Sequence, residues 1–168
     1  PAAPPPGVER TVGRGCDYAT LGEALAAADP GDTLLLEGGV TFHENVTIGE
    51  SVALEGGYKG CGSGSADPTT IDGGGSGQVF EIAAGLRVTL ENLGVTNGDS
   101  GNGGGGIRFA AGASGTGNLT LTNVAIYGNS AKVGGGLWVG RDAQVTGVGV
   151  QIHGNSALDY GGGVRLFG

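Results

Sequence analysis

Short runs in which apolar and polar residues alternate cover most of the chain from Thr33 onward. A period of two is the pattern of β-strands, because successive side chains of a strand point to opposite faces. Glycine-rich segments separate these runs and predict turns between them. The predicted strands are residues 34–37, 46–48, 52–55, 79–82, 88–90, 119–121 and 145–146.

One segment near the start has a helical period instead. Thr20 and Glu23 form a capping-box pattern, in which each side chain accepts a hydrogen bond from the other residue's backbone. The residues that share an apolar face after this cap are Leu21, Ala24, Leu25 and Ala28. Pro30 and Gly31 end the pattern. We expect this helix to cover the open end of a stack, because end units of stacked folds must be shielded.

Two phrases of the sequence are repeated. Gly104-Gly105-Gly106-Ile107 returns as Gly134-Gly135-Gly136-Leu137 and again as Gly161-Gly162-Gly163-Val164. Ile126-Tyr127-Gly128-Asn129-Ser130-Ala131 returns as Ile152-His153-Gly154-Asn155-Ser156-Ala157. A period in the twenties to low thirties is typical of stacked structural units rather than of one irregular core.

Strands and repeats together predict a single right-handed parallel β-helix of about five turns. Winding the chain in this way stacks like residues in columns, so Ile107, Leu137 and Val164 would share one inward column. The amide ladders expected at the corners are Asn92 over Asn123 and Asn129 over Asn155. Three parts are predicted: a Pro-rich arm or linker at 1–15, a capping-helix region at 16–32, and a β-helix at 33–168. The β-helix is either complete or incomplete at its C-terminal end, and both alternatives stay open.

The charge balance excludes several partner classes. Sixteen acidic and eight basic residues give a formal charge of −8, and a surface of this sign repels the phosphate backbone of nucleic acids. No apolar run approaches the roughly 18 residues that a membrane-spanning helix needs. Glycine supplies 40 of the 168 residues without a strict three-residue period, which excludes collagen.

The chain contains two cysteines, Cys16 and Cys61. We expect an extracellular or cell-surface location, and because the rest of the chain looks like a secreted protein we expect a disulfide between the two cysteines, the alternative being two free thiols. A zinc site is not expected, because two cysteines and two distant histidines lack the spacing of zinc ligands.

Three glutamates are the candidates for a metal site. Glu37, Glu55 and Glu91 each end a predicted strand, and in register their carboxylates would gather a cation such as calcium. The alternative, which we favour, is that they are solvated glutamates at strand ends, because their sequence intervals do not guarantee register. No bound cofactor is therefore expected.

No catalytic residue is assigned. A glycosidase pair of carboxylates would come from Asp67, Asp72, Glu81 and Asp99, but nothing in the sequence selects two of them. Arg87 and Arg108 are candidates for a lyase base, although neither lies in a recognisable motif. The aromatic residues of the two best repeats are candidates for contact with a ligand or a neighbouring protein: Tyr127, Trp138 and Tyr160.

Two stretches carry a family resemblance. The segment from Tyr18-Ala19-Thr20-Leu21 to Glu44-Asn45-Val46-Thr47-Ile48 resembles the start of right-handed parallel β-helix proteins of the pectate-lyase-like superfamily. Ile126-x-x-Asn129 with Gly135-Gly136-Leu137, and the equivalent phrase around Asn155, resemble the repeats of bacterial polymorphic outer-membrane proteins. This second resemblance implies surface adhesion, and the isoleucines stand where those repeats usually have phenylalanine.

We therefore expect a non-enzymatic secreted or cell-surface module for adhesion or structural assembly. The last repeat, which ends at Val164-Arg165-Leu166-Phe167-Gly168, would expose strand edges unless something covers it. Two arrangements would cover this coil: self-association, with filaments as one outcome, or further β-helix in a longer chain. A glycan or a host-surface molecule is another expected partner. The alternative function is a carbohydrate-active enzyme, a polysaccharide lyase or hydrolase, or a fragment of one.

Overall fold

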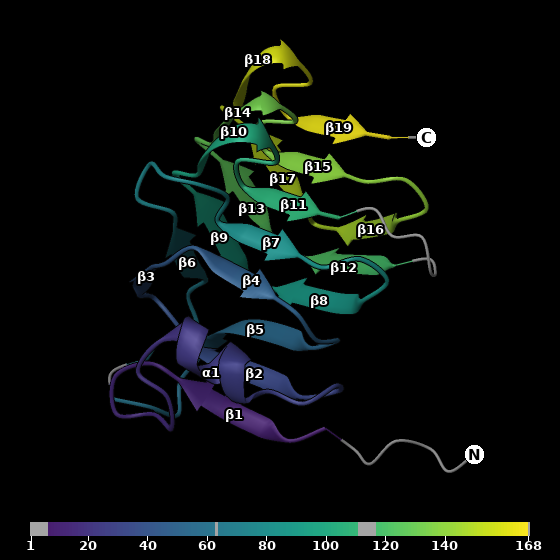
Figure 1. Ribbon diagram of the computed structural model, residues 1–168. Coiled ribbons are helices and arrows are strands. Elements are labelled where there is room, and N and C mark those ends of the chain that lie inside the picture. Colours follow the sequence, from purple (N-terminus) through teal and green to yellow (C-terminus); the bar gives the residue numbers. More distant parts are fainter. Residues whose placement is uncertain (1–6, 63, 111–116, 168) are drawn as a thin grey trace, which may run out of the picture.

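The chain winds into an all-β parallel solenoid of about six turns, as predicted. The computed structural model describes residues 7–62, 64–110 and 117–167. Figure 1 shows the turns stacked from the N-terminal end at the bottom to the C-terminal end at the top. Residues 1–6 of the predicted Pro-rich arm lie outside the described residues.

Four parallel sheets form the walls of the solenoid. Sheet A contains β1 (Glu9–Val12), β2 (Thr33–Glu37), β5 (Ala53–Tyr58), β8 (Arg87–Glu91), β12 (Asn118–Thr122) and β16 (Gln144–Val148). Sheet B contains β3 (Thr41–His43), β6 (Thr69–Asp72), β9 (Leu93–Thr96), β13 (Ala125–Tyr127) and β17 (Gln151–His153). Sheet C contains β4 (Val46–Ile48), β7 (Phe80–Ile82), β11 (Ile107–Phe109), β15 (Leu137–Val139) and β19 (Val164–Leu166). Sheet D contains β10 (Asp99–Gly103), β14 (Ser130–Val133) and β18 (Ser156–Tyr160).

The core consists of apolar columns that run along the solenoid axis. On sheet C the inward column is Val46, Phe80, Ile107, Leu137 and Val164, in register from strand to strand. The predicted column of Ile107, Leu137 and Val164 is therefore confirmed. Most strands of sheets A, B and C place one or two aliphatic or aromatic side chains inside, in the period of two seen in the sequence.

The solenoid begins earlier in the chain than predicted. Residues 9–12, which the sequence analysis assigned to an arm or linker, form β1 and pair in parallel with β2. This strand brings sheet A to six strands, which accounts for about six turns instead of five. The side chain of Asp32 is buried and holds β1 in place by accepting hydrogen bonds from Val8 N (2.7 Å) and Arg10 Nε (2.7 Å).

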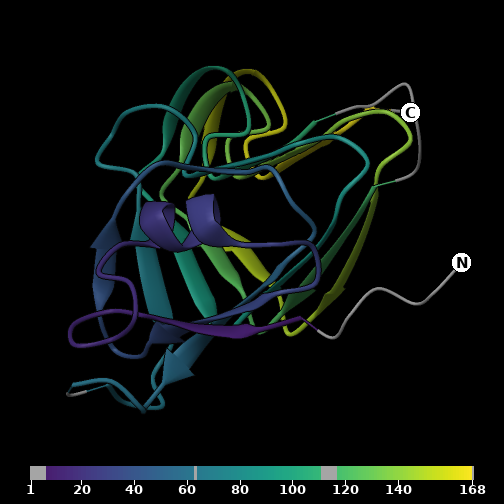
Figure 2. The same ribbon diagram turned by 60° about the horizontal axis from the view of Figure 1, so that its bottom comes forward.

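Helix α1 (Leu21–Ala27) lies across the N-terminal end of the core, as predicted (Figure 2). Thr20 and Glu23 form the predicted capping box, and Leu21 and Ala24 are the buried residues of the helix. A second cap comes from Glu44, whose carboxylate accepts hydrogen bonds from the backbone N–H groups of Leu21 and Gly22, each at 2.8 Å. These contacts fasten the helix to the first complete turn.

The corners between sheets A and B need a left-handed backbone. Asn92 (φ 53°), Asn123 (φ 51°) and Gly149 (φ 66°) occupy equivalent corners of successive turns. Asparagine and glycine tolerate this region better than other residues do. The predicted Asn92–Asn123 ladder is present, with Asn123 Nδ2 donating to Asn92 Oδ1 at 3.4 Å.

The repeated glycine phrase forms the corner before three strands of sheet C: β11, β15 and β19. The first glycine turns the chain, as Gly134 does with a φ of 61°. The third permits close stacking, because a Cβ built on Gly136 would lie 2.6 Å from the carbonyl oxygen of Gly163. Neighbouring turns can therefore approach at this corner only where side chains are absent.

A buried amide ladder stands beside these glycines. Asn129 is 1% exposed, and its Oδ1 accepts from Gly98 N at 2.9 Å. Its Nδ2 donates to the carbonyl oxygens of Val95 and Tyr127 and to Asn155 Oδ1, each at 3.0 Å. The predicted pairing of Asn129 with Asn155 is confirmed, and it links three successive turns.

Candidate functional site

The outward face of sheet C carries a column of charged and aromatic side chains. Glu81, Arg108, Trp138 and Arg165 occupy equivalent positions of neighbouring strands. Arg108 forms an ion pair with Glu81, and its guanidinium lies 5.2 Å from the centre of the Trp138 ring. Trp138 thus faces outward, as predicted, but its ring already has protein neighbours: Arg108 and Phe167, whose ring centre is 5.6 Å away.

Arg165 ends this column in the last described turn. Its guanidinium lies 5.5 Å from the ring centre of Tyr160 and 5.0 Å from that of Phe167, close enough for cation–π attraction. Its Nε is buried, and no described residue accepts a hydrogen bond from it. The predicted interaction candidate Tyr160 is 65% exposed and so remains accessible next to this cation.

Tyr127, the third aromatic candidate, lies on a different face. Its ring stacks on His153 of the next turn, with 5.5 Å between ring centres and 7° between the planes. A hollow of about 370 Å³ adjoins Tyr127, and the small residues Thr70, Gly94 and Ala125 are among those that line it. The structure therefore separates Tyr127 on sheet B from Trp138 and Tyr160 at sheets C and D.

The three glutamates do not form one column. Glu55 and Glu91 are register partners, and Thr122 continues the column. Glu37 does not belong to it, because Leu35 pairs with Glu55 and the register then shifts before Glu37. Glu37 is buried and accepts a hydrogen bond from Arg14 N at 2.7 Å. Among the described residues, no group of three or more His, Cys, Asp or Glu side chains is arranged to hold a metal ion.

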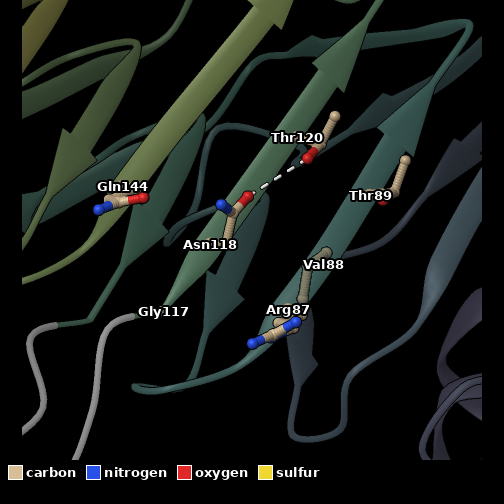
Figure 3. A pocket seen from close by; sticks show the side chains of 7 residues that line it. All are labelled: Arg87, Val88, Thr89, Gly117, Asn118, Thr120 and Gln144. Atoms are coloured by element: carbon tan, nitrogen blue, oxygen red, sulfur yellow. Dashed lines mark hydrogen bonds between the residues drawn. The ribbon is translucent and has the colours of Figure 1, made fainter.

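Sheet A carries a polar hollow of about 380 Å³ (Figure 3). Its outer edge is formed by Arg87, Asn118 and Gln144, which are aligned across three strands. Thr89 and Thr120 line its floor, and Thr120 donates a hydrogen bond to Asn118 Oδ1 at 3.3 Å. The lining residues include one arginine and no carboxylate, so this hollow does not combine the arginine with an acid.

One pair of titratable groups was not anticipated. His43 and Asp72 are register partners on sheet B, and His43 Nδ1 lies 3.7 Å from Asp72 Oδ2. Hydrogen bonds from Gly74 N and from Asn97 Nδ2 lower the pKa of Asp72. The sequence holds a signal for this pair, because Thr41-Phe42-His43 and Thr70-Ile71-Asp72 share a threonine, a large apolar residue and a polar residue.

The other predicted enzyme candidates are not assembled into one site. Glu81 is bound to Arg108 on sheet C, whereas Asp72 lies on sheet B and Arg87 on sheet A. Asp67 accepts a hydrogen bond from Ser65 Oγ at 2.9 Å in a separate loop, and Asp99 begins a strand of sheet D.

The predicted disulfide between Cys16 and Cys61 is present, with 5.2 Å between the Cα atoms. It joins the loop after β1 to the loop after β5 and so connects the first turns of the solenoid. Among the described residues, no helix has both the length and the apolar character needed to cross a membrane.

The fold and these side-chain columns define a parallel β-solenoid repeat protein. Comparison of the chain with protein-family models, with curated proteins and with solved structures finds no match. The solenoid fold implied by the two family resemblances is shown, while membership of the pectate-lyase-like or polymorphic outer-membrane families remains a hypothesis.

Proposed function

We propose that this chain is a non-enzymatic module of the cell surface or the extracellular space that serves adhesion or structural assembly. In this proposal, the last described turn receives a further β-coil, which completes the stack. The observation that carries the proposal is the apolar surface of that turn. Its exposed apolar side chains are Val148 (67%), Leu158 (86%), Tyr160 (65%), Val164 (39%), Leu166 (65%) and Phe167 (43%).

The backbone of the last described turn supports the same proposal. The strands β16, β17, β18 and β19 each stand at the end of their sheet, so they pair with a described neighbour on one side only. An unpaired edge of this kind is a template for another strand. The apolar side chains and the strand edges therefore offer the two interactions that hold neighbouring turns together elsewhere in the solenoid.

The size of the apolar surface suits association. Burying one large aliphatic or aromatic side chain contributes about 1.5–3 kcal/mol. Association costs about 4–15 kcal/mol in lost translational and rotational freedom, so several side chains must be buried together. The exposed set meets this requirement, because it extends over sheets A, C and D.

The disulfide supports the proposed location. Disulfide bonds persist in oxidising compartments and are rare in the reducing cytosol. Cys16 and Cys61 are both in the bonded state, and no free cysteine is found among the described residues.

Sedimentation velocity over a wide concentration range tests the proposal. We expect species larger than the 16.3 kDa monomer, in amounts that increase with concentration. Leu158→Lys with Leu166→Lys should shift association to higher concentration, because both lysines place charge on the apolar surface. Ala84→Lys, on an exposed loop at the side of the solenoid, is the matched control and should leave association unchanged. A monomer at every concentration would overturn the proposal.

A further inference from the structure

The outward face of sheet B carries the hollow beside Tyr127, which the proposed assembly does not use. Its lining residues come from four successive turns, those of β6, β9, β13 and β17, which are neighbours in the sheet (Figure 1). The volume of about 370 Å³ falls within the range of roughly 300–1,000 Å³ that is typical of small-molecule sites. The hollow is therefore large enough for one ring-sized ligand.

Small side chains in one outward column create the space. Three register partners of successive turns supply them: Thr70, Gly94 and Ala125. Gly94 lies inside β9, where glycine weakens a strand, and its backbone lacks the left-handed φ that would call for glycine. The atoms nearest to a Cβ built on Gly94 are side-chain atoms, with Thr70 Oγ1 at 3.2 Å and Tyr127 Cε1 at 3.6 Å. Glycine inside a strand often marks a close approach by a ligand, and Gly94 has this position.

An aromatic ring and an amide stand on opposite sides of this column. Tyr127 and Asn123 flank Ala125 along the chain, and both line the hollow. His153 of the next turn stacks on the Tyr127 ring and so restricts its orientation. Asn123 is exposed at the corner, and the exposed Gln151 lines the hollow one turn further on. Each amide has an N–H group that donates and an oxygen that accepts hydrogen bonds.

The lining favours a neutral ligand. Among the described residues, those that line the hollow carry hydroxyl, amide, aromatic and aliphatic groups but no acidic or basic side chain. A charged ligand would lose water without gaining an opposite charge, which is unfavourable. The formal charge of −8 disfavours an anion further. A neutral molecule with several hydroxyl groups and an apolar C–H face matches both the amides and the aromatic ring.

An extended peptide does not suit this position. Peptides that bind to sheets usually add a strand at an exposed edge and pair through backbone hydrogen bonds. The hollow lies instead on the face of the sheet, where β6, β9 and β13 are each paired on both sides. The ligand must therefore be recognised by side chains alone.

We propose that this hollow binds one neutral hexopyranose unit of a glycan. The C–H surface of the sugar lies against the Tyr127 ring, and its hydroxyl groups form hydrogen bonds with the amides of Asn123 and Gln151. This inference goes beyond the proposed function, because the site lies on the side of the solenoid and its occupation requires no association through the last turn.

An NMR titration of the full chain tests the inference. The probes are the methyl glycosides of glucose, galactose and mannose, each added separately, with methyl glucuronide as the acidic counterpart of the glucoside. We expect saturable shifts of the backbone amide signals of Gly94, Ala125 and Gln151 with at least one neutral glycoside. The expected dissociation constant is about 1–10 mM, as for other ligands of this size. Methyl glucuronide should cause no saturable shift of these signals.

Three variants and a control locate the binding. Ala125→Leu fills the hollow and Tyr127→Ala removes its aromatic side, so each should weaken binding by about tenfold or more. Asn123→Gly removes an amide but tolerates the φ of 51° at this corner, and it should weaken binding by about threefold to tenfold. The matched control is His153→Ala, which removes the ring stacked on Tyr127 but does not line the hollow. It should retain most of the affinity.

The outcomes separate this inference from the proposed function. Loss of the glycoside-induced shifts in Ala125→Leu and Tyr127→Ala, with retention in His153→Ala, supports the site. Unchanged binding by Ala125→Leu overturns it, as does the absence of saturable shifts with all three neutral glycosides. A chain that is monomeric at every concentration but binds the glycoside in the hollow leaves this inference standing and overturns the proposed assembly. A chain that associates but binds no glycoside overturns this inference alone. Circular dichroism of each variant confirms that the solenoid is folded.

Discussion

Replacement of Asn129 by alanine should destabilise the solenoid more than the replacement of an exposed polar residue would. The amide is buried and lies between turns, where it accepts from Gly98 N and donates to Val95 O. Alanine leaves both backbone groups without their side-chain partner, and the corner is buried, since Asn129 is 1% exposed. Each buried group left without a hydrogen bond costs about 1–3 kcal/mol, so the expected loss for the two groups is about 2–6 kcal/mol.

Urea unfolding, followed by circular dichroism and by the fluorescence of the single tryptophan, measures this loss. The matched control is Asn118→Ala, because Asn118 is half-exposed on sheet A and its side chain accepts one hydrogen bond, from Thr120. The control should stay within about 0.5 kcal/mol of the parent chain. A loss for Asn129→Ala as small as that of the control would refute the reasoning, because it would mean that the hydrogen bonds of the Asn129 amide contribute little to stability.

Asn129→Asp gives an independent readout of the same ladder. The carboxylate keeps the acceptor for Gly98 N, but its second oxygen faces the carbonyl oxygens of Val95 and Tyr127 and Oδ1 of Asn155. Like-signed partial charges at about 3 Å repel each other, so this variant should be less stable than Asn129→Ala near neutral pH. Stability that improves on acidification, as the carboxyl group takes up a proton, would support this account, and equal stability of the two variants would contradict it.

Two further predictions concern the N-terminal turns. Cys16→Ser should lower the free energy of unfolding by about 4 kcal/mol, because the bridge closes a loop with a sequence separation of 45. Reduction of the parent chain should reproduce the loss. A urea midpoint that is unchanged in the variant would contradict the prediction. Hydrogen bonds from Asp29 N, Val8 N and Arg10 Nε lower the pKa of Asp32 from 3.8 to about 2. This carboxylate stabilises the fold fully above pH 3.8, and the stabilisation should be lost as the pH falls towards 2. Asp32→Asn should flatten that part of the stability–pH curve, and an equally steep curve would contradict the assignment.

Local patterns made much of the fold predictable. Thr20 and Glu23 identify the helix within a few residues, and the repeated phrases around Asn129 and Asn155 set the register of the last turns. These features depend on residues close in sequence or on exact repetition. Register between the first turns is not local, so the sequence could offer Glu37 as a column member only on the condition of register, and the β2–β5 pairing shifts between Leu35 and Glu37. The favoured expectation of a solvated glutamate is wrong for Glu37, which is buried.

The first strand was missed for a different reason. Among its residues only Val12 is buried, so β1 lacks the alternation that predicts a strand. Its position depends on distant partners, chiefly the buried carboxylate of Asp32. The His43–Asp72 pair was missed for a related reason, because their proximity depends on how sheet B aligns across turns.

The stacking interactions also explain why an exposed turn would select its partner. Apolar burial is not directional, so Leu158 and Leu166 alone would accept many surfaces. Directional groups recur along the stack, as in the Asn129–Asn155 ladder and in the outward column that contains Arg108 and Arg165. A partner coil must therefore match an amide, an arginine and a strand edge at fixed separations. Copies of this chain are built with that same spacing, because strand separation in every parallel stack is about 4.8 Å. Specificity for a β-coil thus follows from the same geometry that holds the solenoid together.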